Sequence, residues 1–355
     1  MIDWKSINQR VLLKEDKYTK FKDIKVFCGT YNVNGKSPDE FLAPWLCLDD
    51  NIDIYAIGFQ EIVDLTTTSL LLRTDWAEKE ESWTNYVKDE LLNKKNFRSN
   101  PNYQLIATRR MFGLYLMVFA SEKLHKKGIT EILSSEIATG ILTVGNKGSV
   151  AVSLKIYETR LCFVCSHFAA DTDKLEKRNA DFRTTSQYLK FQSDQQDQNS
   201  NNYIDLDQHD IIFWFGDLNY RIDSISLNET LKLINSSSFS ELIKYDQLTN
   251  ERKKSRVFEY YEEGEINFRP TYKYLVKSDI YEKQAMIQQQ QPNINFNDEN
   301  SFDNIENQIG RVKLPSWTDR VLYKSSNLKV NLLKYICINT MTISDHKPVM
   351  IVLIC

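Results

Sequence analysis

The stretch from Phe213 to Arg221, Phe-Trp-Phe-Gly-Asp-Leu-Asn-Tyr-Arg, constrains this chain more than any other. The apolar run from Ile211 to Phe215 has the length and composition of a strand buried on both faces. Gly216 ends it, and an aspartate, an asparagine and an arginine follow within five residues. Because buried polar groups cost free energy unless they are paired, their presence here needs an explanation. A plain Asx-type turn is one explanation, and a functional site is the other.

Polar side chains follow other predicted strands in the same way. Strands are predicted over 24–33, 53–59, 103–121 (two strands), 149–157, 161–166, 211–215, 321–323 and 349–354, and helices over 76–91, 175–189 and 223–248. At strand ends stand Asn32, Asn34, Glu61, His167, Asp217, Asn219, Asp319, Asp345 and His346. Each alone can be a turn or cap residue. Together they are harder to explain, because several buried carboxylates without a cation are costly.

A hard divalent cation would relieve that cost. Mg²⁺ binds one or two carboxylates and shares its other positions with water and phosphate oxygens. Glu61 is the best candidate ligand, with Asn34 or Asp345 in support. Asp217, which no lysine adjoins, can hold a water molecule and take its proton.

The remaining groups suit a phosphate substrate. Asn32 and Asn219 can donate hydrogen bonds to phosphate, and His346 can donate to developing charge while Asp319 holds its other nitrogen. The glycine turn before the strand at 149–157 carries Lys147, which can meet a phosphate as a point charge. It is not a P-loop, because an asparagine interrupts the Gly-Lys pair and a strand follows.

Composition narrows the possible partners and compartment. The formal net charge of -3 gives no whole-protein attraction to nucleic acid or anionic membrane, so anion binding must come from a local basic cluster. The six cysteines are scattered and mostly lie in apolar runs, which predicts reduced core thiols. No secretory signal or apolar run of about 18 residues is found, so a cytosolic compartment is expected.

Neither a linker nor an internal repeat divides the chain, which favours one α/β domain. Residues 1–20 have apolar positions at helical spacing and predict an N-terminal helical extension, with the main domain over 21–355. Residues 284–308 are rich in Gln and Asn, and we expect a disordered insertion because they have little to bury.

Seven blocks of the chain resemble motifs of the inositol polyphosphate 5-phosphatases: 31–35, 58–61, 145–148, 166–167, 214–221, 315–320 and 344–348. They follow the family's order, and Gly-Asp-Leu-Asn-Tyr-Arg and Pro-x-Trp-x-Asp-Arg are its two signature motifs. The Pro-Thr-Tyr-Lys-Tyr block looks closest to the type II group, which includes the Lowe-syndrome phosphatase. The resemblance implies the DNase I-like (endonuclease/exonuclease/phosphatase) fold, two packed β-sheets flanked by helices, with 21–355 as the catalytic domain.

The resemblance also implies a mechanism, in which Mg²⁺ assists in-line attack by water without a phosphoenzyme. By motif, Glu61 matches the metal ligand and Asp217 the residue that orients and deprotonates the water. The catalytic residues it implies are Asp217, Asn219, His346, Asp319, His167 and Asn32. The substrate-binding residues that we expect are Lys147, Tyr272, Lys273, Arg311, Lys313 and Arg221.

Four of these residues match the family's contacts to a neighbouring 4-phosphate, namely Tyr272, Lys273, Arg311 and Lys313. In the type II pattern lysine precedes arginine in the last two places, and here the order is reversed. Both positions keep a positive charge, but the guanidinium, which can bind a phosphate through two hydrogen bonds, stands at the other position. This exchange affects the preference among substrates. Residues 112–117 align with a region that contacts lipid chains.

The resemblance thus predicts Mg²⁺-dependent removal of the 5-phosphate from phosphatidylinositol 4,5-bisphosphate, the 3,4,5-trisphosphate and soluble inositol polyphosphates. The expected setting is a monomeric catalytic domain of a larger protein, peripheral on cytosolic membrane faces, with no nucleic-acid partner. One alternative is a nuclease of the same fold, which the acidic balance and the lack of a basic stripe disfavour. Another is a catalytically silent phosphoinositide-binding module, which would require a broken set of core residues.

Overall fold

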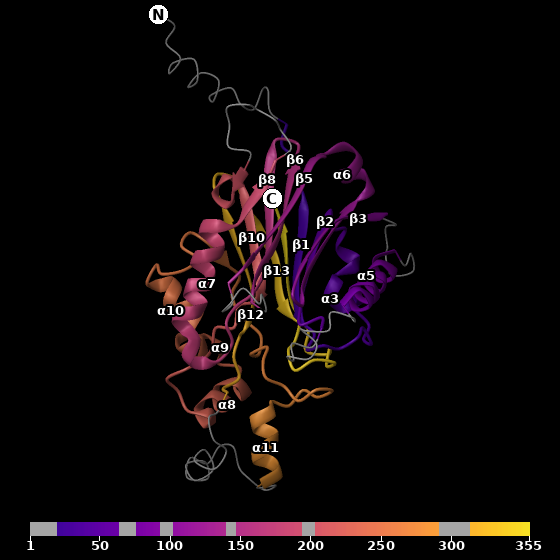
Figure 1. Ribbon diagram of the computed structural model, residues 1–355. Coiled ribbons are helices and arrows are strands. Elements are labelled where there is room, and N and C mark those ends of the chain that lie inside the picture. Colours follow the sequence, from indigo (N-terminus) through magenta and orange to yellow (C-terminus); the bar gives the residue numbers. More distant parts are fainter. Residues whose placement is uncertain (1–19, 64–75, 93–101, 140–146, 194–202, 291–312) are drawn as a thin grey trace, which may run out of the picture.

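Two six-stranded β-sheets pack face to face, and helices cover their outer faces (Figure 1). This computed structural model describes residues 20–63, 76–92, 102–139, 147–193, 203–290 and 313–355. The two-sheet sandwich implied by the resemblance is therefore confirmed. The helical extension predicted over 1–20 lies outside the described residues, apart from its last residue.

The first sheet is built around a parallel pair, β1 and β2, with antiparallel strands on both sides. In spatial order its strands are β13 (Asn331–Cys337), β14 (Val349–Ile354), β1 (Lys25–Asn32), β2 (Ile54–Gln60), β4 (Leu114–Ser121) and β3 (Tyr103–Met111). Because β1 and β2 run the same way, both carboxyl ends reach one edge of the sheet.

The second sheet repeats this plan around the parallel pair β7 and β10. In spatial order its strands are β11 (Glu262–Glu263), β12 (Asp319–Ser325), β10 (Ile211–Asp217), β7 (Thr159–His167), β6 (Gly148–Ile156) and β5 (Ile129–Ala138). A separate two-stranded sheet joins β8 (Lys190–Gln192) and β9 (Tyr203–Asp205).

Helices lie on the two outer faces, with α3 and α5 on one side and α7 and α10 on the other (Figure 1). The α-helices are α3 (Ala43–Leu46), α5 (Trp76–Leu92), α6 (Glu122–Lys127), α7 (Leu175–Tyr188), α8 (Leu227–Asn235), α9 (Phe239–Leu242), α10 (Gln247–Lys253) and α11 (Glu282–Gln290). Short 3-10 turns are η1 (Leu48–Asp50), η4 (Thr172–Lys174), η5 (Leu206–Gln208) and η6 (Ile243–Tyr245).

Three apolar layers hold these elements together. Between the sheets, the Phe163 and Phe213 rings stack with centroids 5.3 Å apart. On the outer face of the first sheet, the α5 residue Trp83 packs on Phe59 at 4.6 Å. On the outer face of the second sheet, Trp214 packs on the α7 residue Phe182 at 5.1 Å. Buried aromatic pairs thus anchor each helical layer to its sheet.

The predicted strands are confirmed within a few residues, but β5, β13 and the short strands β8, β9 and β11 were not predicted. The helical region expected over 223–248 is three α-helices, α8 to α10, with the 3-10 turn η6 before α10. All six cysteines are free, as predicted. Among the helices of the described residues, none is long and apolar enough to cross a membrane.

The insertion predicted over 284–308 begins later than expected. Its first seven residues belong to α11, where Ile287 is fully buried in a hydrophobic cluster that continues into the core between the sheets. The prediction was wrong for this part because the segment does have apolar side chains to bury, namely Ala285 and Ile287. Residues 291–308 lie outside the described residues.

Candidate active site

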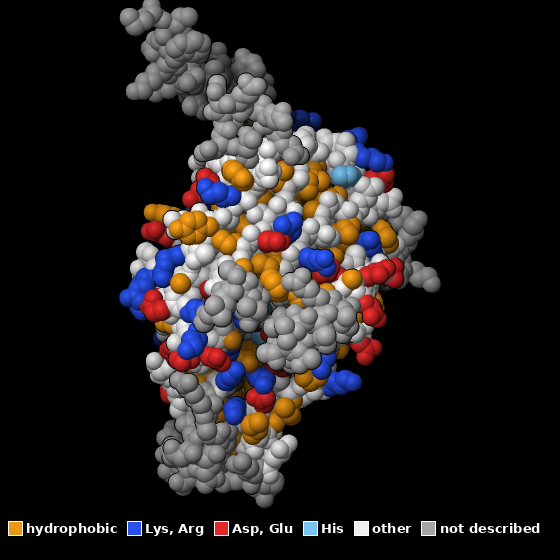
Figure 2. Space-filling model, viewed as in Figure 1, with side chains coloured by type: hydrophobic (Ala, Val, Ile, Leu, Met, Phe, Trp, Pro, Cys, Tyr) orange, Lys and Arg blue, Asp and Glu red, His pale blue; other side chains and the backbone are white. Residues whose placement is uncertain are grey.

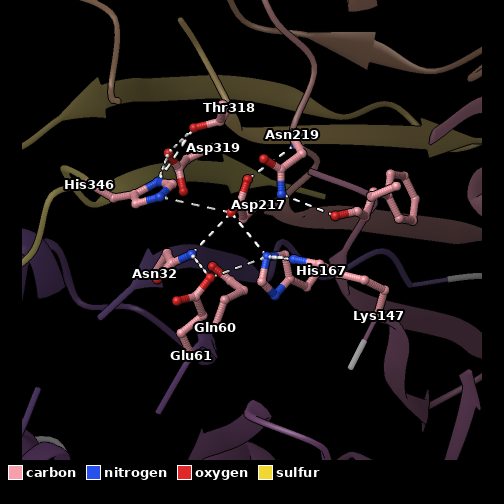
Figure 3. A network of polar contacts seen from close by, with 12 residues as sticks. Asn32, Gln60, Glu61, Lys147, His167, Asp217, Asn219, Thr318, Asp319 and His346 are labelled. Carbon is pink, nitrogen blue, oxygen red and sulfur yellow. Dashed lines mark hydrogen bonds and ion pairs between the residues drawn. The ribbon is translucent and has the colours of Figure 1, made fainter. Parts of the chain in front are cut away.

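The predicted polar residues meet at one edge of the sandwich because parallel strands end there in both sheets (Figure 3). Asn32 ends β1 beside Gln60 of β2, with Glu61 next in the chain. His167 ends β7 beside Asp217 of β10. β12 runs antiparallel to β10, so its first residue, Asp319, also pairs with Asp217. Five strand ends from distant parts of the sequence thus reach one place.

Asp217 lies at the centre of this cluster and is almost fully buried. Its Oδ2 accepts a hydrogen bond from Asn32 Nδ2 at 3.0 Å and lies 3.3 Å from His167 Nε2. Burial alone would raise the pKa of this carboxyl group. The hydrogen bond from His167 and the positive charges of His346 and Lys147 instead hold the pKa of Asp217 well below its usual range. Asp217 is therefore a carboxylate at neutral pH.

His346 and Asp319 form the acid–histidine pair that the sequence predicted. His346 Nδ1 lies 2.9 Å from Asp319 Oδ2, and its Nε2 lies 4.0 Å from Asp217 Oδ2. Burial would lower the pKa of His346, but the charge and hydrogen bond of Asp319, with the charge of Asp217, raise it to about 9. The imidazole is thus protonated at neutral pH and directs Nε2–H toward the centre of the cluster.

Glu61 closes the cluster on the side of the first sheet. Its Oε1 accepts from Asn32 Nδ2 at 3.3 Å and lies 3.7 Å from His167 Nε2, so one amide joins Glu61 and Asp217. The Glu61 side chain is 26% exposed, in contrast to the buried Asp217. Its backbone is left-handed, with φ 53°, which is uncommon for a residue with a side chain.

Lys147 reaches the cluster from the turn before β6. Its Nζ contacts His167 Nε2, the atom that also faces Asp217. Burial lowers the pKa of Lys147, while the charges of Asp217 and Glu61 act in the opposite direction. His167 Nδ1 is buried and makes no hydrogen bond to the described residues.

Asn219 and Arg221 are both buried behind Asp217. The backbone N–H of Asn219 donates to Asp217 Oδ1 at 3.1 Å, and its side-chain amide donates to the carbonyl of Phe168 at 3.1 Å. Arg221 donates to the Asn219 side-chain oxygen and, at 3.1 Å, to the Asn219 carbonyl. The roles predicted for these two residues, contacts to phosphate and substrate, stay predictions. Here both of them support the turn that follows β10.

The residues expected to bind a 4-phosphate each contact a different part of the protein. Tyr272 packs against His346, with ring centroids 4.3 Å apart. Lys273 Nζ pairs with Glu282 of α11 at 2.6 Å. Lys313 Nζ lies 3.4 Å from Asp171, and Arg311 lies outside the described residues. The structure therefore joins Tyr272 to the cluster and pairs each of the two described lysines with a carboxylate.

The stretch at 112–117, expected near lipid chains, is mostly interior. Leu114 to Met117 are buried in β4, and only Phe112 is partly exposed, with its ring 5.5 Å from Trp76. Gly113 accepts a backbone hydrogen bond from Ile62, the residue after Glu61, which sets the β3–β4 turn beside the cluster. A lipid contact at this turn stays a prediction.

Comparison with known proteins agrees with this geometry. A family model described as endonuclease/exonuclease/phosphatase family 2 matches residues 29–352. The type I inositol polyphosphate 5-phosphatase 8 of Arabidopsis thaliana is 32% identical over 96% of this chain and 72% of its own length. The chain belongs to the inositol polyphosphate 5-phosphatases. The fold expected from the resemblance is thereby confirmed.

Two further relatives of this inositol polyphosphate 5-phosphatase chain are informative. A crystal structure of the 5-phosphatase domain of SPsynaptojanin, in complex with inositol (1,4)-bisphosphate and calcium ion, matches with a TM-score of 0.79. The identity is 30%, over 99% of this chain and 90% of that one. The type II inositol 1,4,5-trisphosphate 5-phosphatase of Mus musculus is 33% identical over 97% of this chain but only 31% of its own length. The chain thus spans less than a third of that relative.

The oxygen donors of this 5-phosphatase cluster fit a hard divalent cation. Burial raises the pKa of Asp345, and the negative charge of Glu61 adds to the rise, so a cation beside them would offset both causes. Asp217, Asp319 and His346 also offer three ligand atoms within 4.8 Å of one another. Asp319 Oδ2 already accepts three hydrogen bonds, whereas Asp319 Oδ1 is buried and has no hydrogen-bond partner among the described residues. The assignment of the ion to Glu61 stays a prediction.

Three residues that support the cluster were not singled out from the sequence. Thr271 and Thr318 donate to Asp319 Oδ2 at 2.6 and 2.8 Å, and Ser344 donates to the carbonyl of Asn32 at 2.7 Å. Each is buried, although a hydroxyl residue in a turn is ordinarily exposed. Only their places inside blocks that resemble the family's motifs could have pointed to them.

Proposed function

We propose that this chain hydrolyses the 5-phosphate of phosphoinositides, with the 4,5-bisphosphate and 3,4,5-trisphosphate lipids as substrates and soluble inositol polyphosphates in addition. One observation carries the proposal. Asp217, a carboxylate of depressed pKa, lies among an amide and two imidazoles where both parallel strand pairs end. Membership of the 5-phosphatase family supports it, as does the inositol bisphosphate bound to a relative with the same fold.

The chain's own residues supply most of the chemistry. Asp217 is ionised and can orient a water molecule and accept its proton. His346, protonated and held by Asp319, can donate through Nε2 to charge that develops on the phosphate. Asn32 adds a neutral donor beside them, and Lys147 lies against His167. The arrangement suits direct attack by water in line with the leaving inositol oxygen.

Mg²⁺ is the cation that we assign to Glu61, with Asn34 or Asp345 in support. When bound, it would polarise the phosphoryl oxygen and neutralise charge on the leaving group. The backbone N–H of Asn34 donates to Asn32 Oδ1 at 3.0 Å, which keeps the turn after β1 against the cluster. Glu61 would hold the ion at the exposed side of the site, where substrate enters.

We assign the action to a lipid headgroup at a cytosolic membrane face, with this chain acting as a monomeric catalytic domain. Lys273 and Lys313 would bind the neighbouring 4-phosphate after exchanging their carboxylate partners for it. In the face shown in Figure 2, acidic and basic side chains are interspersed without a continuous basic stripe. That surface suits a small phosphorylated headgroup better than a nucleic-acid duplex.

Phosphate release from short-chain phosphatidylinositol 4,5-bisphosphate tests the proposal. The wild-type protein should release phosphate with Mg²⁺ and not after the metal is removed by EDTA. Asp217→Asn should lower kcat by roughly 10³-fold or more, because water loses the group that takes its proton. Circular dichroism of this variant should match the wild type.

The controls distinguish the alternatives. Inositol 1,4,5-trisphosphate tests the soluble substrates, and a DNA duplex with an abasic site tests the nuclease. Cleavage of DNA without release of inositol-bound phosphate would overturn the proposal in favour of a nuclease. Lipid binding without turnover by the wild-type protein would establish a silent binding module instead.

A further inference from the structure

The ring of Tyr272 makes a set of contacts that a role in substrate binding does not require. Its centroid lies 4.3 Å from that of the His346 imidazole, with an interplanar angle of 35°. The guanidinium carbon of Arg221 lies over the same ring, 4.7 Å from its centroid. All three side chains are at most 8% exposed. A hydroxyl that reached a phosphate would need none of this packing.

The backbone ties the same segments together. Tyr272 forms isolated antiparallel bridges with both Ser316 and His346. On either side of it, Lys347 N–H donates to the carbonyl of Thr271 and Tyr274 N–H donates to that of Asp345, each at 2.9 Å. The peptide of Tyr272 is therefore fixed relative to the peptide of His346, so the contact between the two rings is not a chance meeting of mobile loops.

The imidazole needs a second support besides Asp319. The hydrogen bond from Nδ1 to Asp319 limits rotation of the ring, but hydrogen bonds tolerate a range of angles, so some tilt about the Cβ–Cγ bond is still allowed. Such a tilt moves Nε2, the atom that faces Asp217 at 4.0 Å. A flat side chain against the face of the imidazole restricts this motion. Among the described residues, Tyr272 is the aromatic ring that packs there.

We propose that Tyr272 is a positioning residue, whose ring, supported by Arg221, holds the His346 imidazole in the orientation that directs Nε2 at the reacting phosphate. The inference rests on the proposed phosphatase function and deepens it. It separates two parts of one side chain: the ring acts on kcat through His346, and the hydroxyl is left to contact substrate. Aromatic rings in contact interact beyond the burial of their area and prefer defined relative orientations, so the ring can fix the orientation of the imidazole.

Two substitutions separate these parts. Tyr272→Phe keeps the ring and should retain kcat on short-chain phosphatidylinositol 4,5-bisphosphate within about twofold, with any loss appearing in KM. Tyr272→Leu keeps apolar volume but removes the flat face, and kcat should fall by roughly 10- to 100-fold. Equal losses of kcat in both variants would overturn the proposal and assign the effect to the hydroxyl. A Leu variant with wild-type kcat would overturn it as well.

A matched control comes from the same segment. The rings of Tyr274 and Tyr281 also stack, with centroids 4.3 Å apart, and Tyr281 makes no contact with His346 in the part of the chain that the structure describes. Tyr281→Leu therefore removes a buried stacked ring at a similar cost in stability. It should lower the melting temperature and retain kcat. If kcat falls as far as in Tyr272→Leu, the effect is general loosening and the proposal fails.

A spectroscopic measurement tests the packing without any substrate or metal. A ring stacked on an imidazole shifts its proton resonances upfield, and the chain has only four histidines to resolve. The His346 resonances are assigned by their loss in His346→Gln. They should move downfield in Tyr272→Leu and stay in place in Tyr272→Phe, even if the protein proves to hydrolyse no phosphoinositide. Unchanged resonances in Tyr272→Leu would overturn the proposed packing, whatever the activity.

Discussion

At the scale of single residues, the neighbours of a buried carboxyl group decide whether its pKa rises or falls. Asp217 and Asp345 are two residues of one type, yet the pKa of the first is depressed and that of the second is raised. The difference comes from their neighbours: two histidines and a lysine lower the pKa of Asp217, whereas at Asp345 burial outweighs the opposing charge of His346 and the charge of Glu61 adds to the rise. Opposite shifts in one cluster are typical of sites that divide acid and base roles.

His209 shows the same physics away from the active site. It is buried, its Nδ1 lies 2.9 Å from the carbonyl of Leu206, and its Nε2 lies 2.8 Å from Ser153 Oγ. A carbonyl can only accept, so Nδ1 carries the proton and the Ser153 hydroxyl donates to Nε2. Burial lowers the pKa of His209 to about 4, because an imidazolium in this place would lose its acceptor atom and its hydration.

This neutral histidine predicts a pH dependence of stability. Between the unfolded pKa of about 6.5 and the folded pKa of about 4, the unfolded chain binds the extra proton, so stability falls as pH falls through that window. The loss should approach roughly 3 kcal/mol at pH 4. Urea unfolding of wild type and His209→Gln from pH 7.5 to 4.5 measures it. The variant should start less stable and show a flatter profile, and parallel profiles would contradict the assignment.

At the scale of elements, the sequence predicted best the strands that are buried on both faces. β10, β7 and β14 are continuous apolar runs, because side chains on both of their faces are covered. β5 and β13 lie at sheet edges, and alternate or mostly exposed residues weaken the apolar signal. Neither the pairing of strands nor the parallel direction of β7 and β10 could be predicted, since neighbours in a sheet are distant in sequence.

Gly216 is the element-scale feature on which the site depends most directly. It lies one residue before Asp217, in register with Ser166 of β7, and has φ 142°. A Cβ atom at this position would lie 2.0 Å from the carbonyl oxygen of Ser166. Only glycine lets the two parallel strands approach so closely at their carboxyl ends, where His167 meets Asp217.

Gly216→Ala should therefore destabilise the protein by roughly 3 kcal/mol or more, because both the backbone angle and the contact with β7 are strained. Gly128→Ala is the matched control. The Cβ atom added there would lie closest to Leu124 Cδ1, the end of a flexible side chain, so the cost should stay below about 2 kcal/mol. Thermal unfolding compares the two. A Gly216→Ala protein that melts within a degree of the wild type would contradict this reading of β10.

At the scale of the whole molecule, the site exists only because two similar half-structures face each other. Each sheet has a central parallel pair, and the hydrogen bond from Asn32 to Asp217 joins one pair to the other across the sandwich. The sequence could predict which residues end strands, and the signature blocks identified the family. The sequence could not predict the distances between side chains of the two sheets, nor the packing of Tyr272 on His346. Both depend on how the sheets and their connecting loops pack in three dimensions.

The Mg²⁺ site that we propose at Glu61 predicts that the stability of the folded protein depends on the cation. If Glu61 holds Mg²⁺ in the folded state alone, a concentration of 100 times Kd stabilises the protein by about 2.7 kcal/mol, which raises Tm by a few degrees. Glu61→Gln should abolish most of this rise. Glu158→Gln should respond as the wild type does, because its side chain is 95% exposed and lies in the turn between β6 and β7, at the opposite end of these strands from His167. A Glu61→Gln protein whose Tm rises as much as the wild type's would show that the ion binds elsewhere, with the Asp217, Asp319 and His346 group as the next site to test.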